Sequence, residues 1–265
     1  MNTLISIHSI NLKTKTNTRF SVVSQSSSTI TAGTYTIQKF TSSGSFVIKG
    51  NKTLYYVIVG GGSSPASTGG NFGSKGGAGG SVVSGINNNT GSVNTTYTIN
   101  IGAGATASGL NSSGIDGSPS SIVYNSITIT ANGGKKDSTA GTTIKGLSGV
   151  TNVTETGASA RGGAGANANC RGCCYSGENQ YNANVQGYTV NIGNSAFIGN
   201  YAGGGAGGDT GNNQTNNAWG GGFPGTCNVG GPGWGTANSG GGAGGDHGSV
   251  ASYGGSGIVL IFYLT

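Results

Sequence analysis

The chain has 265 residues, of which 57 are glycine, 33 serine, 30 threonine and 28 asparagine. Charged residues make up 7% of the chain, and the formal net charge is +6. These four abundant residue types are poor helix formers, so the composition excludes an ordinary helical or α/β enzyme. Collagen is excluded because glycine does not recur at every third position and only 4 residues are proline. Because no run approaches about 20 consecutive apolar residues, we expect no membrane insertion.

The charge is unevenly distributed along the sequence. All 12 lysines and arginines lie at or before Arg171, whereas residues 172–265 carry only three charged residues, all acidic. The basic residues are scattered and form no dense run. A groove that binds a phosphate backbone needs denser positive charge with interleaved aromatic residues, so we expect no nucleic-acid partner. Residues 1–34 are basic and are predicted to form an extended arm that docks onto another protein of an assembly. This region lacks a basic segment followed by a continuous apolar core, so no secretion signal is predicted.

Short apolar runs bounded by glycine, serine and asparagine indicate strands separated by turns. In chain order, strands are predicted at residues 35–40, 46–48, 54–59, 82–83, 97–101, 122–124, 127–130 and 258–263. The runs at 54–59 and 258–263 are continuously apolar, which is typical of strands buried on both faces. We therefore expect these two strands to pair at the centre of a sheet.

The glycine-rich segments between the strands differ from ordinary turns. Gly-Gly-Ala-Gly begins at residues 76, 162, 204 and 241 without a fixed period, which argues against a solenoid. Bare glycine backbones can form extended helices with about three residues per turn and can approach one another closely. We predict that these tracts pack into a lattice whose core is backbone; flexible linkers are the alternative. Polar loops are expected at residues 167–200, 209–218, 225–229, 236–239 and 246–253.

The predicted fold is therefore all-β, with β-sandwich-like strands, packed glycine tracts of the polyglycine II type, long polar loops and essentially no helix. We expect two regions: the arm at residues 1–34 and a glycine-rich β domain at 35–265. Within the domain, residues 35–134 are strand-rich, 135–257 hold the glycine tracts with variable loops, and 258–264 form a closing strand.

The cysteines and two of the acids are candidates for cross-linking or metal binding. Cys170, Cys173, Cys174 and Cys227 could together hold zinc, but a second paired half-site is missing, and disulfides or free thiols are the alternatives. Asp209 and Asp246 each follow Gly-Gly-Ala-Gly-Gly, half of a calcium-binding repeat. Glycine stands where that repeat needs an apolar residue, so both acids are also read as surface turn residues. No cofactor is expected.

Enzymatic chemistry has little support in the sequence. The chain has six carboxylates and two histidines, with no paired carboxylates and no Ser-His-Asp spacing, so we expect a non-enzymatic protein. Aromatic residues among glycine, serine and asparagine instead suggest a binding surface. The candidate receptor-contact residues are Tyr175, Tyr181, Tyr188, Trp219, Phe223 and Trp234. The alternative for each is packing against the edge of the lattice.

The order of several motifs is informative as a set. Residues 40–48 read FTSSGSFVI and are followed by YVIVGGG at 56–62 and GGAGGSVVSG at 76–85. YTINIGAG at 97–104 comes next, then GSPSS at 117–121 and ITANGG at 129–134, and YGGSGIVLI at 253–261 closes the series. This order resembles the glycine-rich domain of phage tail-fibre and adhesin proteins and of structural proteins of large DNA viruses. The resemblance extends over about residues 35–265.

The resemblance implies a protein on the surface of a virus particle, whose variable loops bind a protein or glycan receptor on a host cell. The arm would contact other virion proteins. The alternative function is a minor capsid or decoration protein of a phage or giant virus that cements neighbouring subunits without binding a receptor. The type of virus, the receptor, and whether the chain forms a homo-oligomer are left open by the sequence.

Overall fold

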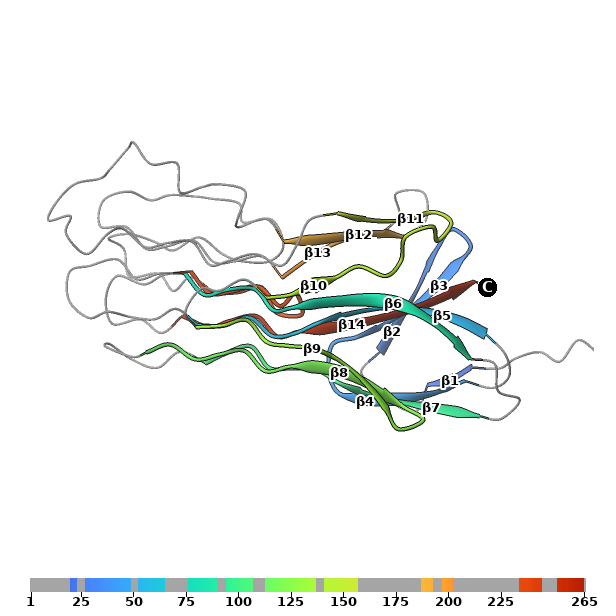
Figure 1. The fold of residues 1–265 in the computed structure, drawn as a ribbon, viewed down its shortest axis with the longest axis horizontal. Coiled ribbons are helices and arrows are strands. Elements are labelled where there is room, and N and C mark those ends of the chain that lie inside the picture. Colours follow the sequence, from blue (N-terminus) through green and yellow to red (C-terminus); the bar gives the residue numbers. More distant parts are fainter. Residues whose placement is uncertain are drawn as a thin grey trace, which may run out of the picture.

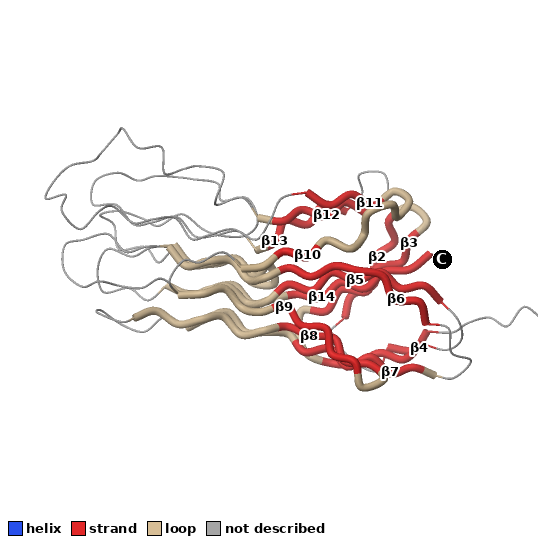
Figure 2. Tube along the Cα trace, in the orientation of Figure 1, coloured by secondary structure: helices blue, strands red, loops and turns tan. Residues whose placement is uncertain are grey.

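The computed structural model describes residues 20–22, 27–48, 52–64, 76–89, 94–106, 113–136, 141–156, 187–192, 197–202, 234–244 and 252–264. This part of the chain consists of strands, turns and extended segments without a helix, so the predicted all-β class is confirmed (Figures 1 and 2). It accordingly holds no helix that is long and apolar enough to cross a membrane.

A six-stranded sheet forms the middle layer of the fold. Its order is β10 (Thr143–Ile144), β6 (Val82–Asn89), β5 (Lys52–Val59), β14 (Ile258–Leu264), β3 (Tyr35–Phe40) and β2 (Ser27–Ala32). β5 pairs with β14 at its centre, as the two continuously apolar runs predicted. All the pairs in this sheet are antiparallel except β10 with β6.

Two smaller antiparallel sheets cover the two faces of the middle layer (Figure 1). One has the order β1 (Phe20–Val22), β4 (Gly44–Ile48), β7 (Thr95–Asn100), β8 (Ser120–Tyr124) and β9 (Ile127–Ala131). The other has the order β11 (Val153–Thr156), β12 (Tyr188–Ile192) and β13 (Phe197–Tyr201).

The middle sheet is buried on both faces because its central strands contribute side chains to two hydrophobic cores, one on each face. Along β14, Ile258, Leu260 and Phe262 belong to the core beneath the three-stranded sheet. The alternate residues Val259 and Ile261, with Tyr263, belong to the core beneath the five-stranded sheet. Full burial of such a side chain stabilises the fold by roughly 1.5–3 kcal/mol. This alternation explains why the run carries no polar residue.

The structure moves two boundaries that the sequence analysis drew. β1 and β2 lie before residue 35 and pair with β4 and β3, so the β domain begins no later than Phe20. The role of residues 1–19 as an arm stays a prediction, since they lie outside the described residues. Residues 188–192 and 197–200, expected within the loop at 167–200, belong to strands β12 and β13. β12 is a strand because Tyr188, Val190 and Ile192 alternate along it and are all buried.

Seven glycine-rich tracts continue from the sheets as nearly parallel extended segments (Figure 2, tan). We name six after the strand that each adjoins and one after its first residue: the β5 tract (60–64), β6 tract (76–81), β7 tract (102–105), β8 tract (115–118), β9 tract (132–135), β14 tract (253–257) and 240 tract (240–243). The two copies of Gly-Gly-Ala-Gly in the described residues begin in the β6 and 240 tracts, which are bonded to each other. The copies at 162 and 204 lie outside the described residues.

The backbone N–H groups of the β5 tract point to three neighbours in turn. Those of Gly60 and Ser63 donate to the β6 tract, and those of Gly61 and Ser64 donate to the β8 tract. That of Gly62 donates to the β14 tract, and all five N···O distances lie between 2.8 and 3.0 Å. The direction therefore repeats after every third residue, as expected for a helix with about three residues per turn.

The carbonyl groups of the β5 tract accept hydrogen bonds from three further tracts. The acceptors Gly61, Gly62 and Ser63 receive N–H groups of the β9, β7 and 240 tracts, at 2.8, 2.9 and 3.0 Å. The six surrounding tracts are also bonded to one another in the closed order β6, β9, β8, β7, β14, 240 and back to β6. The β5 tract is thus the centre of a hexagonal lattice, and the predicted backbone core is confirmed for these tracts. Flexible linkers are the wrong description of them.

Glycine is required in the lattice because the backbones touch. A Cβ added to Gly60, Gly61 or Gly62 would overlap a backbone carbonyl oxygen of a neighbouring tract. The Cα–H groups of these residues therefore face carbonyl oxygens, a geometry that permits weak Cα–H···O bonds. The outer positions differ: Ala103 and Ser118 carry exposed side chains. On this side of the lattice, the outer tracts therefore carry side chains that face solvent, whereas the central glycines carry only hydrogen atoms.

A polar cluster joins the three-stranded sheet to the middle sheet. The carboxylate of Glu155 on β11 accepts hydrogen bonds from the Tyr188 hydroxyl (2.5 Å), the Leu147 N–H (3.0 Å) and the Ser84 hydroxyl of β6. Burial, together with the hydrogen bond and the charge of Glu155, raises the pKa of Tyr188 far above its ordinary value. Tyr188 therefore stays protonated and remains a donor to Glu155 over the ordinary pH range.

The lattice predicts that two substitutions differ strongly in their effect on the free energy of unfolding. Gly62→Ala should lower the free energy of unfolding by about 3 kcal/mol or more, because its methyl group has only backbone to displace. Ala103→Val adds more bulk at an exposed position of the β7 tract and should change it by at most about 0.5 kcal/mol. Urea denaturation of the three proteins measures both effects. Equal stability of the Gly62→Ala variant and the wild type would contradict the lattice.

The polar cluster predicts that Glu155→Gln lowers the free energy of unfolding by less than Gly62→Ala does. The amide nitrogen of glutamine cannot accept a hydrogen bond, so one of the three donors loses its acceptor, at a cost of about 1–3 kcal/mol. Thr154→Ala, at an exposed neighbouring position on β11, is the matched control and should be nearly neutral. Denaturation curves that coincide for both variants would show that the cluster does not hold the sheets together.

Candidate interaction surface

The two ends of the molecule are built differently. At the end that we call the far end, the glycine tracts run away from the sheets (Figures 1 and 2). Four described segments end on this side, at Ser64, Thr106, Lys136 and Gly244, and one begins there, at Gly76. The interruptions at 65–75, 107–112, 137–140 and 245–251 all begin at this end of the lattice. The far end is therefore where most chain segments between tracts are attached.

The opposite end, the sheet end, holds both described ends of the chain. β1 begins at Phe20 opposite Ile48, and β14 ends at Leu264 opposite Tyr35. The Lys52 Nζ donates to the Leu264 carbonyl at 3.1 Å and lies 4.6 Å from the ring centre of Tyr263. Burial lowers the pKa of Lys52. The chain thus enters and leaves the described fold on the side away from the lattice.

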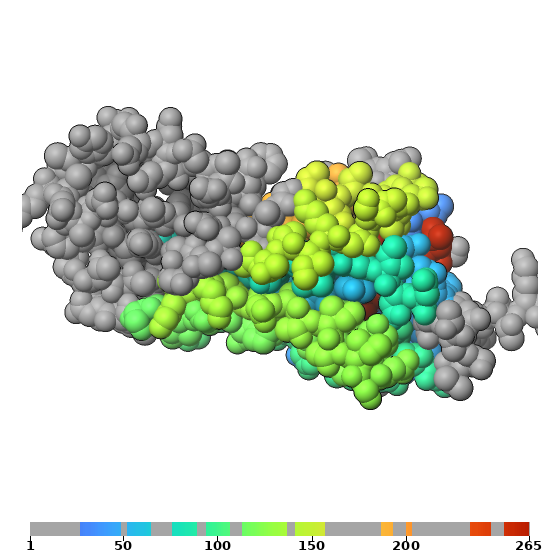
Figure 3. Space-filling model, viewed as in Figure 1, coloured from blue at the N-terminus to red at the C-terminus, as the bar shows by residue number. Residues whose placement is uncertain are grey.

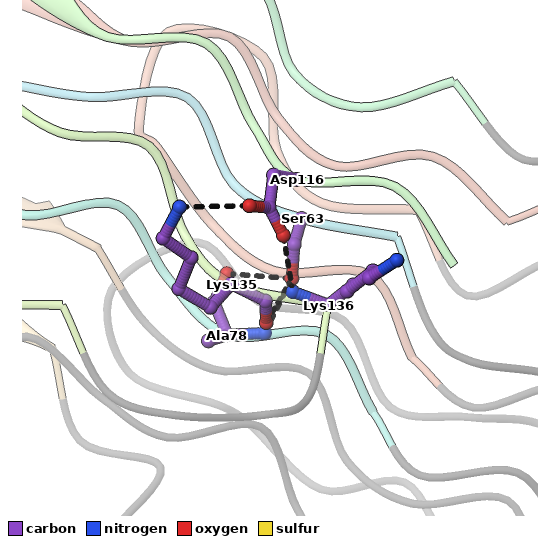
Figure 4. Close-up of polar contacts among 5 residues, drawn as sticks. All are labelled: Ser63, Ala78, Asp116, Lys135 and Lys136. Atoms are coloured by element: carbon purple, nitrogen blue, oxygen red, sulfur yellow. Dashed lines mark hydrogen bonds and ion pairs between the residues drawn. The ribbon is translucent and has the colours of Figure 1, made fainter. Parts of the chain in front are cut away.

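An ion pair ties together two tracts at the far end (Figure 4). The Asp116 carboxylate accepts from Lys135 Nζ at 2.7 Å and from the Lys136 backbone N–H at 2.8 Å. Burial raises the pKa of Asp116, but the hydrogen bonds and positive charges of Lys135 and Lys136 outweigh it, so the net shift is downward. The Ser63 hydroxyl donates to the Lys135 carbonyl at 2.9 Å and accepts from the Ala78 N–H at 2.8 Å. These contacts fix the β5, β6, β8 and β9 tracts relative to one another.

The β8 and β9 tracts lie on the face drawn in Figure 3, where residues 113–136 form a green strip along the sheets and the lattice. The side chains of Lys135 and Asp116 are 54% and 40% exposed on this strip. The pair is therefore accessible to solvent, and it acts mainly to order the tract ends.

Two aromatic residues are exposed on another part of the lattice. Trp234 is 55% exposed and Tyr253 is 42% exposed. Their ring centroids are 6.5 Å apart in an edge-to-face arrangement. The Gly235 N–H donates to the Tyr253 carbonyl at 2.7 Å, so the two segments are also joined through their backbones. The preceding residue, Ser252, is buried, and its hydroxyl has no hydrogen-bond partner among the described residues.

The structure places the predicted contact residues in different environments. Tyr188 was expected to be exposed, but it is fully buried and bonded to Glu155, so it is not a contact residue. Trp234 is exposed and remains a candidate. The other candidates lie outside the described residues: Tyr175, Tyr181, Trp219 and Phe223, the cysteines Cys170, Cys173, Cys174 and Cys227, and the acids Asp209 and Asp246. Their roles stay predictions.

The sequence reasoning did not single out the Asp116 and Lys135 pair or the Glu155 cluster. Nineteen positions separate Asp116 from Lys135, and their approach follows from the hydrogen bond between the β8 and β9 tracts. The turn at 236–239 was expected to be a loop thrown off the lattice. The structure places it beside Gly60 and Ser256, at the border between sheets and lattice, because Gly240 already starts the next tract there.

The chain was compared with curated protein sequences and with protein families. None of the curated protein sequences matches the chain. A family model described as a glycine-rich domain matches residues 41–264, which include every described strand from β4 to β14 in chain order and all seven tracts. The chain therefore belongs to the glycine-rich domain family.

Proposed function

We propose that this chain is a non-enzymatic structural protein on the surface of a virus particle, and that it attaches the particle to a host cell. The observation that carries the proposal is the difference between the two ends of the fold. Segments between tracts are attached at the far end, whereas the described ends of the chain lie at the sheet end. One end is thus suited to anchoring and the other to display.

The lattice supports display because it fixes the starting points of several loops. Hydrogen bonds between neighbouring tracts hold the residues that flank these loops, and the Asp116 ion pair adds a further link at the far end. Binding to loops on a rigid support loses less conformational freedom than binding to free chains. A scaffold of this kind permits loop sequences to vary without changing the core.

The viral setting of the proposal depends on the ordered motifs, which resemble those of phage tail-fibre and adhesin proteins. Family membership itself concerns the glycine-rich domain. On this proposal, residues 1–19 extend from the sheet end toward other virion proteins, and receptor contacts come from the far end. The alternative is a cementing role in a capsid, and the following experiment distinguishes it from host attachment.

A bulky label at each end separates attachment from cementing. We would introduce an azide-bearing amino acid at Thr106, exposed at the far end, or at Thr128, exposed near the β8–β9 turn, and couple polyethylene glycol to it. In a binding assay of the labelled full-length chain on a panel of bacterial and unicellular eukaryotic cells, attachment to a host should be lost with the Thr106 label and kept with the Thr128 label.

Two results would contradict host attachment through the far end. One is equal binding by both labelled chains. The other is an electron-microscopic image of the particle in which the far end is buried against neighbouring subunits, which is the arrangement expected of a cementing protein.

A further inference from the structure

We propose that Trp234 and Tyr253 form a binding site for a neutral sugar ring. The inference rests on the proposed function, because it names the class of ligand that one surface of the lattice would take.

The aromatic pair is held by backbone and is therefore ordered before any ligand arrives. The Gly235 N–H bonds to the Tyr253 carbonyl, and the Gly254 N–H bonds to the Ala105 carbonyl. Gly235 is packed so tightly that an added Cβ would overlap Gly241 and Gly255. Two half-exposed rings in a fixed edge-to-face arrangement give a ligand a rigid apolar surface at little cost in conformational entropy.

The surroundings of the pair favour a sugar over a protein partner. The adjoining residues in the two segments are Gly235, Thr236, Gly254 and Gly255, so no other large apolar side chain extends the surface along the chain. A stable protein interface needs a much larger area, of roughly 800 Å² on each partner. A sugar ring needs only an aromatic face for its C–H groups and nearby polar groups for its hydroxyls.

The charge distribution favours a neutral sugar over an acidic one. Residues 234–244 and 252–264 contain no charged side chain. The lysines at the far end, Lys135 and Lys136, adjoin the β9 tract, which lies across the central β5 tract from the β14 tract. A sialylated or phosphorylated ligand would require a nearby arginine or lysine to pair with its charge. Neither segment supplies one.

The test uses the full-length chain on an array of neutral oligosaccharides of glucose, galactose, mannose and N-acetylglucosamine, with sialylated oligosaccharides beside them. We expect binding to at least one neutral oligosaccharide, and a loss of about tenfold or more in affinity for both Trp234→Ala and Tyr253→Ala. Tyr253→Phe keeps the ring and should retain most of the binding. Ile86→Ala, which shortens an exposed apolar residue of β6, is the matched control and should bind as the wild type does.

A thermal melt of each variant shows whether it is folded. If an alanine variant does not fold, Tyr253→Phe, which keeps the ring, still allows a comparison of binding with the wild type. Binding only to sialylated sugars, no binding to any sugar, or binding unchanged in folded Trp234→Ala and Tyr253→Ala variants would each overturn the inference. The array contains no cells, so its result is independent of host attachment. No sugar binding on the array, together with cell binding that persists in both alanine variants, refutes the sugar site and leaves the proposed function standing. Sugar binding without cell binding refutes the proposed function alone.

Discussion

The contact of glycine backbones around the β5 tract is the constraint on which the rest of the structure depends. All five residues of this tract donate backbone hydrogen bonds, and the Cα–H groups of Gly60, Gly61 and Gly62 face carbonyl oxygens of neighbours. Buried backbone polar groups must be paired, and here they are paired between tracts rather than within a sheet or helix. The glycine-rich composition therefore forms a backbone core beside the two hydrophobic cores, and this core needs no large side chains.

The sheets and the lattice depend on each other because they share the same segments. Residues 52–64 form the central strand β5 and then the central tract, and β14 likewise continues the β14 tract. The register of β5 with β6 and β14 therefore sets how the tracts meet beyond Val59. Apolar burial orders the strands, and the strands deliver glycine backbones in alignment. This coupling reduces the entropy cost of ordering chains that would be flexible alone.

Sequence reasoning predicted the features that depend on local pattern. The apolar run at 258–263 indicated a strand buried on both faces, and the recurrent glycine tracts indicated close backbone packing. It failed where the pattern was weak or the contact distant. β2 is an edge strand of serine and threonine with little apolar signal, and the alternation that begins at Tyr188 was hidden in a polar segment. The approach of Asp116 to Lys135 depends on the order of tracts around the lattice, which no local pattern encodes.

Hydrogen exchange of the β5 tract tests the backbone core most directly. Amide groups exchange slowly only where they are hydrogen-bonded in a structure that opens rarely. If the lattice exists in solution, the amides of Gly60, Gly61 and Gly62 should be protected to the same degree as those of β5 and β14, although no large side chain covers them. Exchange of these three amides at the rate of an unfolded chain, with the strands still protected, would contradict the account.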